Sequence, residues 1–235
     1  MSQLFIVATP IGNLADITFR AVETLKSVDI IACEDTRNSR VLLDHYQIKK
    51  PLISYHQHSG ETKVDEIIAL LKVGKNLAVI TDAGTPGISD PGNKLVAEVI
   101  NQLGDDCQII AIPGASAVVT ALAVCGLPTD KFLFLGFMPH KKGKETMMRL
   151  MAEGKITSVF YESTHRILKT LNKMVEIIGE SRKIVVCREL TKKFETIYRG
   201  SLKEVAEKLN NNIVKGEFVV IVSGNYEDKN KEIYE

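Results

Sequence analysis

Side chains able to take part in acid–base chemistry gather in three short segments of the sequence. Each segment places carboxylates directly beside cations. The segments are CEDTRNS at 33–39 with Glu34, Asp35, Thr36 and Arg37, FYESTHR at 160–166 with Tyr161, Glu162, His165 and Arg166, and CRELTKKFE at 187–195 with Arg188, Glu189, Lys192 and Lys193. A carboxylate that faces a ligand can accept a proton from it, whereas one that faces water forms an ion pair worth little energetically. The residue types alone leave both interpretations open.

A second group of segments is rich in glycine and proline and has few reactive side chains. These segments are VATPIGNLADIT at 7–18, DAGTPGISDPG at 82–92 and PGASA at 113–117. Glycine lets the backbone approach a ligand closely, and proline stiffens a loop, so such segments suit the binding of a small ligand by N–H and C=O groups. One such loop alone is usually only a turn, but three at the same edge of a sheet favour a ligand site.

The glycine-rich loops do not match a phosphate cradle. The motifs GxGxxG and GxxxxGK[ST] are both missing from the sequence. Asp82 and Asp90 in the second loop would also repel a phosphate, so we expect a ligand with a cationic or neutral centre. His56 and His58 lie two residues apart without an acidic or cysteine partner nearby, so we expect no metal site.

The elements that must position these segments alternate in the first half of the chain. Short apolar runs predict strands, and 3.6-residue patterns between them predict helices. The expected strands are 4–8, 29–33, 52–55, 77–81 and 108–112, and the expected helices are 18–28 (with Thr18 as N-cap), 61–74 and 92–104. Strands without polar alternation are buried on both faces, which is typical of a parallel sheet covered by helices. Loops after such strands lie at one edge, where α/β proteins bind ligands.

The second half of the chain predicts a mixed sheet. The expected strands are 132–137, 158–162, 183–187, 195–200 and 217–223, and the expected helices are 144–153, 164–178 and 201–210. Ser201 and Glu204 form a capping box at the last of these helices. The strands 183–187 and 195–200 leave no room for a helix between them, so they should be antiparallel.

The two halves also differ in charge. Residues 1–113 carry 10 Lys/Arg and 14 Asp/Glu, a net charge of −4, whereas residues 114–235 carry 20 and 15, a net charge of +5. This asymmetry suggests a partner with phosphates on the C-terminal half. We place the seam between the halves near IPGASA at 112–117, and expect an N-terminal α/β domain at 1–113, a C-terminal α/β domain at 114–225 and a polar tail at 226–235. The basic stretch 138–151 holds His140, Lys141, Lys142, Lys144 and Arg149. It would suit contacts to the phosphates of a nucleic acid, or it is a solvated helix start.

Composition excludes several classes of protein. Apolar residues make up 45% of the 235-residue chain, enough for a core, so disorder is not expected. The four cysteines lie in or beside apolar runs without a CxxC motif, which predicts a reducing compartment. No apolar run reaches the ~20 residues of a membrane span, and the N-terminus lacks a signal-peptide pattern. We expect a cytoplasmic protein with no membrane contact.

Taken together, the motifs resemble the tetrapyrrole methylase superfamily and, within it, the ribosomal RNA small subunit methyltransferase I branch. The matching stretches are VATPIGNLADIT, EDTR, ITDAGTPGISDPG, IPGASA, FYESTHR, RELTKKFE and KGEFV, which extend from residue 7 to residue 219. The resemblance implies two α/β domains with S-adenosylmethionine in the cleft between them, and a homodimer. It further implies methyl transfer to the ribose 2′-oxygen of a cytidine in the decoding region of 16S rRNA, without a metal.

The resemblance also assigns residues to the cofactor. On the positions that match the motifs, these are Ile11, Gly12, Gly84, Thr85, Ile88, Ser116, Ala117, Tyr161 and Glu162. Thr85 replaces an aspartate that many relatives carry, which fits the ribosomal branch better than a porphyrin or corrin methylase. Thr164 stands where the branch usually has proline, and a C-terminal extension of many relatives is missing, which puts RNA docking in question but not the cofactor site.

The charged segments are the expected surroundings of the target ribose. The catalytic candidates are Asp35, Arg37, Glu162, His165, Arg166 and Glu189, with Glu34 as an alternative to Asp35. Asp35 or Glu162 would act as the base, and Arg37, Arg166 and Arg188 would hold phosphates. A methylase of the same fold acting on a tetrapyrrole or another small molecule, and a non-catalytic module that binds S-adenosylmethionine or RNA, remain alternatives.

Overall fold

The computed structural model describes residues 1–56, 59–210 and 215–226. The chain forms two compact units, the first from Met1 to Ser116 and the second from Ala117 onward. That these units fold as domains with the boundaries 1–113 and 114–225 stays a prediction. His58 and all of the predicted polar tail except Tyr226 lie outside the described residues.

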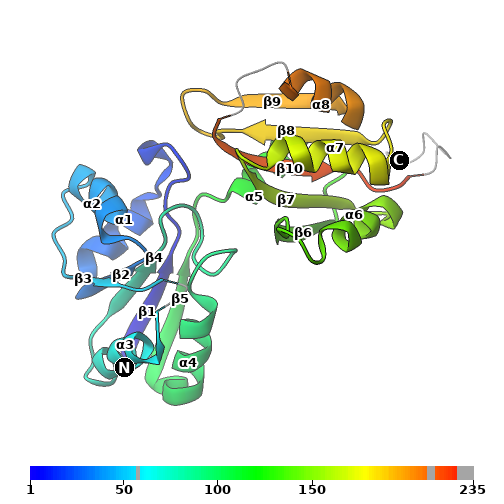
Figure 1. Cartoon of the computed structure of the whole chain (residues 1–235). Coiled ribbons are helices and arrows are strands. Elements are labelled where there is room, and N and C mark those ends of the chain that lie inside the picture. Colours follow the sequence, from blue (N-terminus) through cyan, green and yellow to red (C-terminus); the bar gives the residue numbers. More distant parts are fainter. Residues whose placement is uncertain (57–58, 211–214, 227–235) are drawn as a thin grey trace. The chain divides into compact units, whose positions relative to one another are not determined.

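The first unit is a parallel sheet covered by helices on both faces (Figure 1). Its five strands have the order β3-β2-β4-β1-β5, and every pairing between them is parallel. The strands are β1 (Ser2–Val7), β2 (Ile30–Cys33), β3 (Leu52–Ser54), β4 (Leu77–Ile80) and β5 (Cys107–Ile112). The helices are α1 (Phe19–Ser27), α2 (Thr36–His45), α3 (Glu61–Lys72) and α4 (Asn93–Leu103), with short 3₁₀ helices at Leu14–Asp16 and Gly104–Asp106.

The strands of this sheet are buried on both sides, as their continuous apolar sequences predict. In β4, Leu77 and Val79 pack with residues of α3 and α4, whereas Ala78 and Ile80 pack with residues of α1 and α2. Successive side chains of a strand point to opposite faces, so two helical layers bury all four side chains. The sheet is thereby fixed, and the loops at its carboxyl edge have a rigid base.

The second unit is a mixed sheet with the order β6-β7-β10-β8-β9. Strand β6 is parallel to β7, and the other pairs are antiparallel, including β8 with β9 as predicted. The strands are β6 (Phe132–Phe137), β7 (Thr157–Ser163), β8 (Lys183–Arg188), β9 (Thr196–Ser201) and β10 (Glu217–Val222). The helices are α5 (Ala117–Cys125), α6 (Lys144–Glu153), α7 (Ile167–Ile178) and α8 (Leu202–Asn210). Helices α6, α7 and α8 share one apolar core with the sheet.

The predicted fold class is confirmed, and each predicted strand agrees with the structure to within two residues at either end. The predicted caps also form. Thr18 accepts a hydrogen bond from the Ala21 N–H, and Ser201 and Glu204 each accept one from the other's backbone N–H. The sequence analysis did not predict α2 or α5, and α7 starts at Ile167 instead of 164 because residues 164–166 form a turn.

All four cysteines are buried free thiols, in line with their apolar surroundings in the sequence. Among the helices of the described ranges, none has the length and apolar character needed to cross a bilayer.

Candidate functional site

The three glycine- and proline-rich loops lie at one edge of the first unit. They follow β1, β4 and β5, which are neighbours in the order β4-β1-β5, so the sheet brings the loops together as predicted. Backbone hydrogen bonds join the first two loops: the Thr9 N–H donates to the Gly84 carbonyl (2.9 Å) and the Gly84 N–H donates to the Thr9 carbonyl (3.1 Å). The Thr85 hydroxyl donates to the Ala115 carbonyl of the third loop (3.3 Å). The three loops therefore form one connected structure.

The backbone conformation favours glycine where these loops meet. Gly84 has a φ of +82°, a backbone conformation that residues other than glycine rarely adopt. A Cβ there would lie 3.5 Å from the Ile11 side chain and 3.9 Å from the Ala115 carbonyl oxygen. The backbone at Gly84 is thus enclosed by both neighbouring loops, which are the segments where the resemblance places the cofactor.

The loop 82–92 is held together by its own hydrogen bonds. The Gly87 N–H donates to the Pro91 carbonyl (3.1 Å), and the Ile88 N–H donates to the Thr85 carbonyl (3.2 Å). The Asn93 amide, at the start of α4, donates to the Gly87 carbonyl (2.9 Å). Ile88 nevertheless keeps 48% of its surface exposed. A rigid loop that holds out an apolar side chain can contact the apolar part of a ligand without first having to order itself.

Carboxylates line the same edge. The Asp35 N–H donates to Asp82 (3.2 Å), and so does the Asn38 amide (2.9 Å). Burial, together with the charges of Glu34 and Asp82, raises the pKa of Asp90 to about 6. Burial likewise raises the pKa of Glu34. Burial is the main cause of both shifts, and the neighbouring carboxylates add to them, so a bound cation would favour the ionised forms.

Asp35 is the N-cap of helix α2, which the sequence analysis did not predict. Its carboxylate accepts the Arg37 N–H (2.8 Å) and both the Nε (3.2 Å) and Nη2 (2.7 Å) of the Arg37 guanidinium. These hydrogen bonds from Arg37 lower the pKa of Asp35 to about 2. Asp35 is therefore ionised at neutral pH but is a weak base, while the Arg37 side chain is 88% exposed and open to a further partner.

Glu162, at the end of β7, is buried with both oxygens occupied. Its side chain is 0% exposed and pairs with the Arg166 Nε (3.2 Å). It also accepts the Ser163 N–H (2.8 Å) and the Thr170 hydroxyl (2.7 Å). The Lys144 ammonium donates to the same Thr170 hydroxyl (2.9 Å), so the network continues to α6. Because protein partners enclose both of its oxygens, this carboxylate is suited to positioning its neighbours and not to contacting a ribose.

Arg166 uses its guanidinium within the protein. Besides Glu162, it donates to the carbonyls of Met138 and Pro139 and lies 3.3 Å from His140 Nε2. It therefore fastens the segment after β6 to the start of α7. Its neighbour His165 is exposed. The structure thus brings Glu162 and Arg166 together, but acceptors within the protein occupy most of the Arg166 donors.

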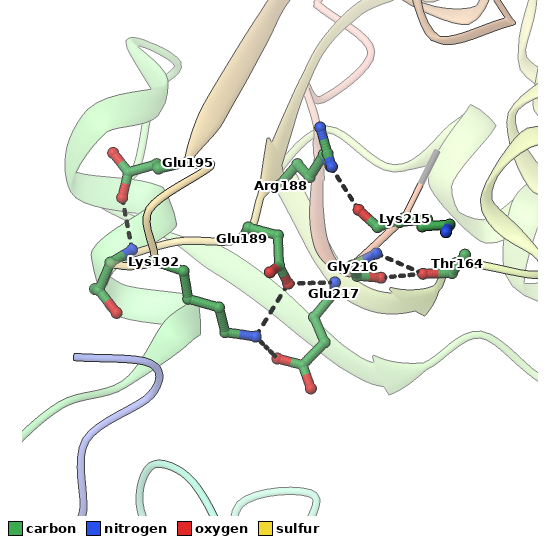
Figure 2. A network of polar contacts seen from close by, with 9 residues as sticks. Thr164, Arg188, Glu189, Lys192, Glu195, Lys215, Gly216 and Glu217 are labelled. Carbon is green, nitrogen blue, oxygen red and sulfur yellow. Dashed lines mark hydrogen bonds and ion pairs between the residues drawn. The ribbon is translucent and has the colours of Figure 1, made fainter. Parts of the chain in front are cut away.

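The third charged segment is a network at the ends of β8 and β10 (Figure 2). Lys192 pairs with Glu189 (3.0 Å) and with Glu217 (2.8 Å), and the Glu217 N–H donates to Glu189 (2.9 Å). Partial burial alone would raise the pKa of Glu189, but the Glu217 N–H and Lys192 together hold it below its usual value. The Arg188 Nε donates to the Lys215 carbonyl (2.6 Å). Glu189 is thus an ionised carboxylate whose partners are fixed.

Thr164 joins this network to the end of β7. Its hydroxyl accepts the Gly216 N–H (2.7 Å) and donates to the Gly216 carbonyl, as Figure 2 shows. Gly216 has a φ of +119°, and a Cβ there would overlap the Glu189 side chain. A threonine at this position, where the resemblance expects proline, therefore has a structural use of its own.

The sequence of the chain matches a known protein family. The sequence pattern described as Tetrapyrrole (Corrin/Porphyrin) Methylases matches residues 3–206. The chain belongs to the tetrapyrrole methylase family. Curated members of this family that resemble the chain carry the name "Ribosomal RNA small subunit methyltransferase I". The protein of Haemophilus influenzae is 49% identical over 98% of this chain and 82% of its own length, and that of Thermotoga maritima is 42% identical over 95% and 99%.

Solved structures of tetrapyrrole methylases share the fold. The methyltransferase CobJ has a TM-score of 0.70 at 18% identity and covers 96% of this chain and 95% of its own. Uroporphyrin-III C-methyl transferase from Thermus thermophilus, complexed with S-adenyl homocysteine, has a TM-score of 0.64 at 16% identity and covers 94% and 97%. At these identities the likeness supports the fold alone.

The candidate cofactor residues of this family member fall in both units. Ile11, Gly84 and Thr85 meet in the joined loops, with Gly12 and Ser116 on the adjoining segments of the same edge. In the second unit, Ala117 begins α5, and Tyr161 packs edge-on against Phe134 and Phe137 at centroid distances of 5.2 and 5.3 Å. The assignment of these residues to the cofactor, like that of the catalytic set, stays a prediction.

The sequence analysis missed several residues that the structure joins to the site. Thr170 and Lys144 extend the Glu162 network, and Asp90 at the loop edge has its pKa raised to about 6, mainly by burial. A signal for Thr170 was present, because Glu162, Arg166 and Thr170 follow one another at intervals of four residues. Nothing in the sequence indicated which carboxylates would lie close enough to repel each other.

Proposed function

We propose that this chain is an S-adenosylmethionine-dependent methyltransferase that acts on the ribosomal RNA of the small subunit, at the ribose 2′-oxygen of a cytidine. The observation that carries the proposal is the similarity, at 42–49% identity over nearly the whole chain, to proteins named ribosomal RNA small subunit methyltransferase I. We further propose, from the resemblance, that it works in the cytoplasm as a homodimer and without a metal. Among the described residues, no group of three or more His, Cys, Asp or Glu is placed to hold a metal ion.

The loop edge of the first unit fits the proposed cofactor. S-adenosylmethionine supplies a methyl group on a positively charged sulfur. The edge combines rigid backbone around Gly84, an exposed Ile88 for an apolar ring, and the mutually repelling carboxylates of Glu34, Asp82 and Asp90. A neutral or cationic ligand suits these carboxylates, whereas a nucleotide phosphate does not.

The chain's residues would contribute mainly alignment. Holding the ribose hydroxyl in line with the methyl group can supply a large part of the rate enhancement. Asp35 is the accessible candidate to accept the hydroxyl proton, but its pKa of about 2 makes it a weak base. Glu162, the other candidate, is enclosed by Ser163, Arg166 and Thr170 and would act by positioning Arg166.

The proposal is tested with small ribosomal subunits from a strain that lacks this gene. The purified protein is incubated with them and with methyl-labelled S-adenosylmethionine, and the RNA is digested to nucleosides and analysed by mass. We expect labelled 2′-O-methylcytidine. Tight cofactor binding without labelled RNA would refute the ribosomal substrate and turn attention to small acceptors, tetrapyrroles first.

The base assignment has its own test. Single-turnover methyl transfer is measured for Asp35→Asn and Glu162→Gln at saturating cofactor. We expect Asp35→Asn to be slowed on the order of 10²-fold if Asp35 is the base. Glu162→Gln should act through Arg166 and therefore change binding of the RNA as well as the rate. Near-normal rates in both variants would show that neither carboxylate is the base.

A further inference from the structure

The second unit contains a groove that none of the site residues predicted from the sequence lines. It lies between the start of α6 and the exposed side of α7, with a volume of about 640 Å³, within the range of small-ligand pockets. Four lysines line it: Lys141, Lys144, Lys169 and Lys173. They come from segments nearly 30 residues apart, so only the fold brings them together. Leu168 adds an apolar patch to the lining.

The positive charge of the groove is only partly offset. Its two carboxylates, Glu145 and Glu176, both pair with Lys173, at 3.4 and 2.9 Å. Within the described ranges, no carboxylate forms an ion pair with Lys141 or Lys169. Lys144 donates to Thr170, and the nearby Glu162 is already paired with Arg166. Within the part of the chain that the structure describes, Lys141 and Lys169 therefore line the groove without an ion-paired carboxylate, and the carboxylate that attracts Lys144, Glu162, is itself paired with Arg166.

Two further features of the groove favour an anion. Helix α6 is ten residues long, and its N-cap, Gly143, has a left-handed φ of +85° and offers no side-chain cap. The N-terminus of a helix carries a partial positive charge. Burial lowers the pKa of Lys144, and the charges of Arg166 and Lys169 lower it further against the opposing attraction of Glu162, so a bound anion would stabilise the charged form of Lys144.

Of the three arginines expected to hold phosphates, Arg37 is exposed, whereas Arg166 and Arg188 of the second unit donate to acceptors within the protein. The Arg166 guanidinium binds Glu162 and two backbone carbonyls, and Arg188 donates to the Lys215 carbonyl. A protein that binds RNA still needs cations for the phosphate backbone, because these contacts supply much of the affinity. The lysine groove offers the cations that these arginines do not.

We propose that the lysine groove between α6 and α7 binds phosphodiester groups of the RNA substrate through Lys141, Lys144 and Lys169. This proposal rests on RNA being the substrate. Lysine suits the role because its ammonium is a mobile point charge on an apolar stem, which can follow a phosphate backbone without reading its sequence. Lys144 also links the groove to Glu162 through Thr170, so bound RNA would rest on the same network that holds Arg166.

The test compares two double variants with the same loss of charge. Lys141→Gln with Lys169→Gln removes two exposed groove lysines, and Lys155→Gln with Lys183→Gln removes two exposed lysines of the same unit outside the groove. Affinity for unmethylated 16S rRNA is measured with saturating S-adenosylhomocysteine at several salt concentrations. We expect the groove variant to lose affinity for the RNA on the order of tenfold. The plot of log affinity against log salt concentration should also be shallower by about 1.4, because each lost contact to a single-strand phosphate lowers its slope by about 0.7. The control variant should match the wild type.

The outcomes separate this inference from the proposed function. Equal affinity and salt slope for both variants would overturn the groove, even if the wild type methylates RNA. A selective loss in the groove variant would support the groove, even if no methyl group is transferred and the proposed function fails. A wild-type protein that neither binds nor methylates the RNA would overturn both. Affinity for S-adenosylhomocysteine alone should be unchanged in all variants, because the groove does not include the loop edge.

Discussion

The loop edge of the first unit and the β7–α7 region of the second both contain residues that the resemblance assigns to function, but the two regions are built differently. At the loop edge, backbone atoms of Thr9, Gly84 and Gly87 make the decisive contacts, and glycine conformations hold the shape. In the β7–α7 region, side chains such as Glu162 and Thr170 make them. The edge carries an excess of carboxylates, and the region beside α6 and α7 carries an excess of lysines.

This difference separates two tasks. A backbone frame has few rotatable bonds, so it is pre-organised for a small ligand of fixed shape. A surface of lysines and arginines adapts to a long, repetitive, charged ligand such as an RNA backbone. The contrast predicts that substitutions at the loop edge change cofactor binding through backbone geometry, and that substitutions in the second unit act through lost side-chain partners.

The largest effect should come from removing the buried carboxylate. Glu162→Ala leaves the Arg166 guanidinium and the Ser163 N–H without their shared acceptor in a region where Glu162 itself is fully buried. Breaking one partner of a buried pair costs about 3–5 kcal/mol. We expect a loss of this size in the free energy of unfolding, measured with urea.

The matched control is an exposed ion pair of the same unit. Glu180 lies 2.9 Å from Lys203, and its side chain is 60% exposed. Glu180→Ala should cost less than about 1 kcal/mol, because exposed pairs contribute little. If both variants lose a similar amount of unfolding free energy, Glu162 does not organise its region. The statement that side-chain contacts hold the β7–α7 region together would then be refuted.

At the loop edge, the next largest effect should come from Gly87→Ala. Gly87 has a φ of +84°, and a Cβ there would lie 2.5 Å from the Asn93 Oδ1. The left-handed backbone costs an alanine about 1–2 kcal/mol. Displacing Asn93 adds about 1 kcal/mol, because it breaks the hydrogen bond to the Gly87 carbonyl. We expect a total near 2–3 kcal/mol in urea unfolding, with weaker binding of S-adenosylhomocysteine.

Gly74 provides the control, because its φ is also +84° but no atom lies within 4 Å of the added Cβ. Gly74→Ala should therefore show the backbone cost alone and keep full affinity for S-adenosylhomocysteine. If both variants lose stability equally and bind the ligand equally well, the closed form of the loop 82–92 has no part in binding.

In the second unit, Thr164→Val should have a smaller effect. Valine keeps the shape of threonine but removes the hydroxyl that bridges the Gly216 N–H and carbonyl. Losing a bridge of this kind costs about 1–2 kcal/mol. Thr164→Ser, which retains the hydroxyl, should stay within about 0.5 kcal/mol of the wild type in the same urea experiment. An equal loss in both variants would assign the effect to the methyl group and not to the bridge.

The same contrast explains how much of the molecule the sequence could predict. The loop edge was predictable, because glycine and proline mark unusual backbone directly and a parallel sheet gathers the loops after β1, β4 and β5. Two contacts between residues far apart in the sequence could not be predicted. Thr164 contacts Gly216, 52 residues away, and Lys144 contacts Thr170, 26 residues away. These contacts depend on register and packing that no local pattern encodes. Helix α2 was missed because Asp35 and Arg37 suggested catalysis, although Asp35 is its N-cap.

The smallest expected effect on stability concerns Asp90, whose substitution also tests how the cofactor's charge is recognised. Its pKa is raised to about 6, so the folded protein holds this proton more tightly than the unfolded chain does. The wild type therefore loses stability as pH rises from about 4 to about 6, and the loss is complete above that. Asp90→Asn cannot ionise, so we expect its Tm to exceed that of the wild type by up to about 3 °C at pH 8, since the half-exposed site limits the gain to below about 1 kcal/mol. The difference should vanish near pH 4.

The same variant separates the two forms of the cofactor. S-adenosylmethionine carries a positive sulfur, and S-adenosylhomocysteine does not. If the carboxylates of Asp90, Glu34 and Asp82 act on that charge, Asp90→Asn weakens the binding of S-adenosylmethionine several-fold and leaves S-adenosylhomocysteine unchanged, as titration calorimetry would measure. Equal affinities for both ligands would mean that the acidic edge faces something other than the sulfonium. The destabilising charge at Asp90 would then have no role in binding, although the backbone frame around Gly84 would still have one.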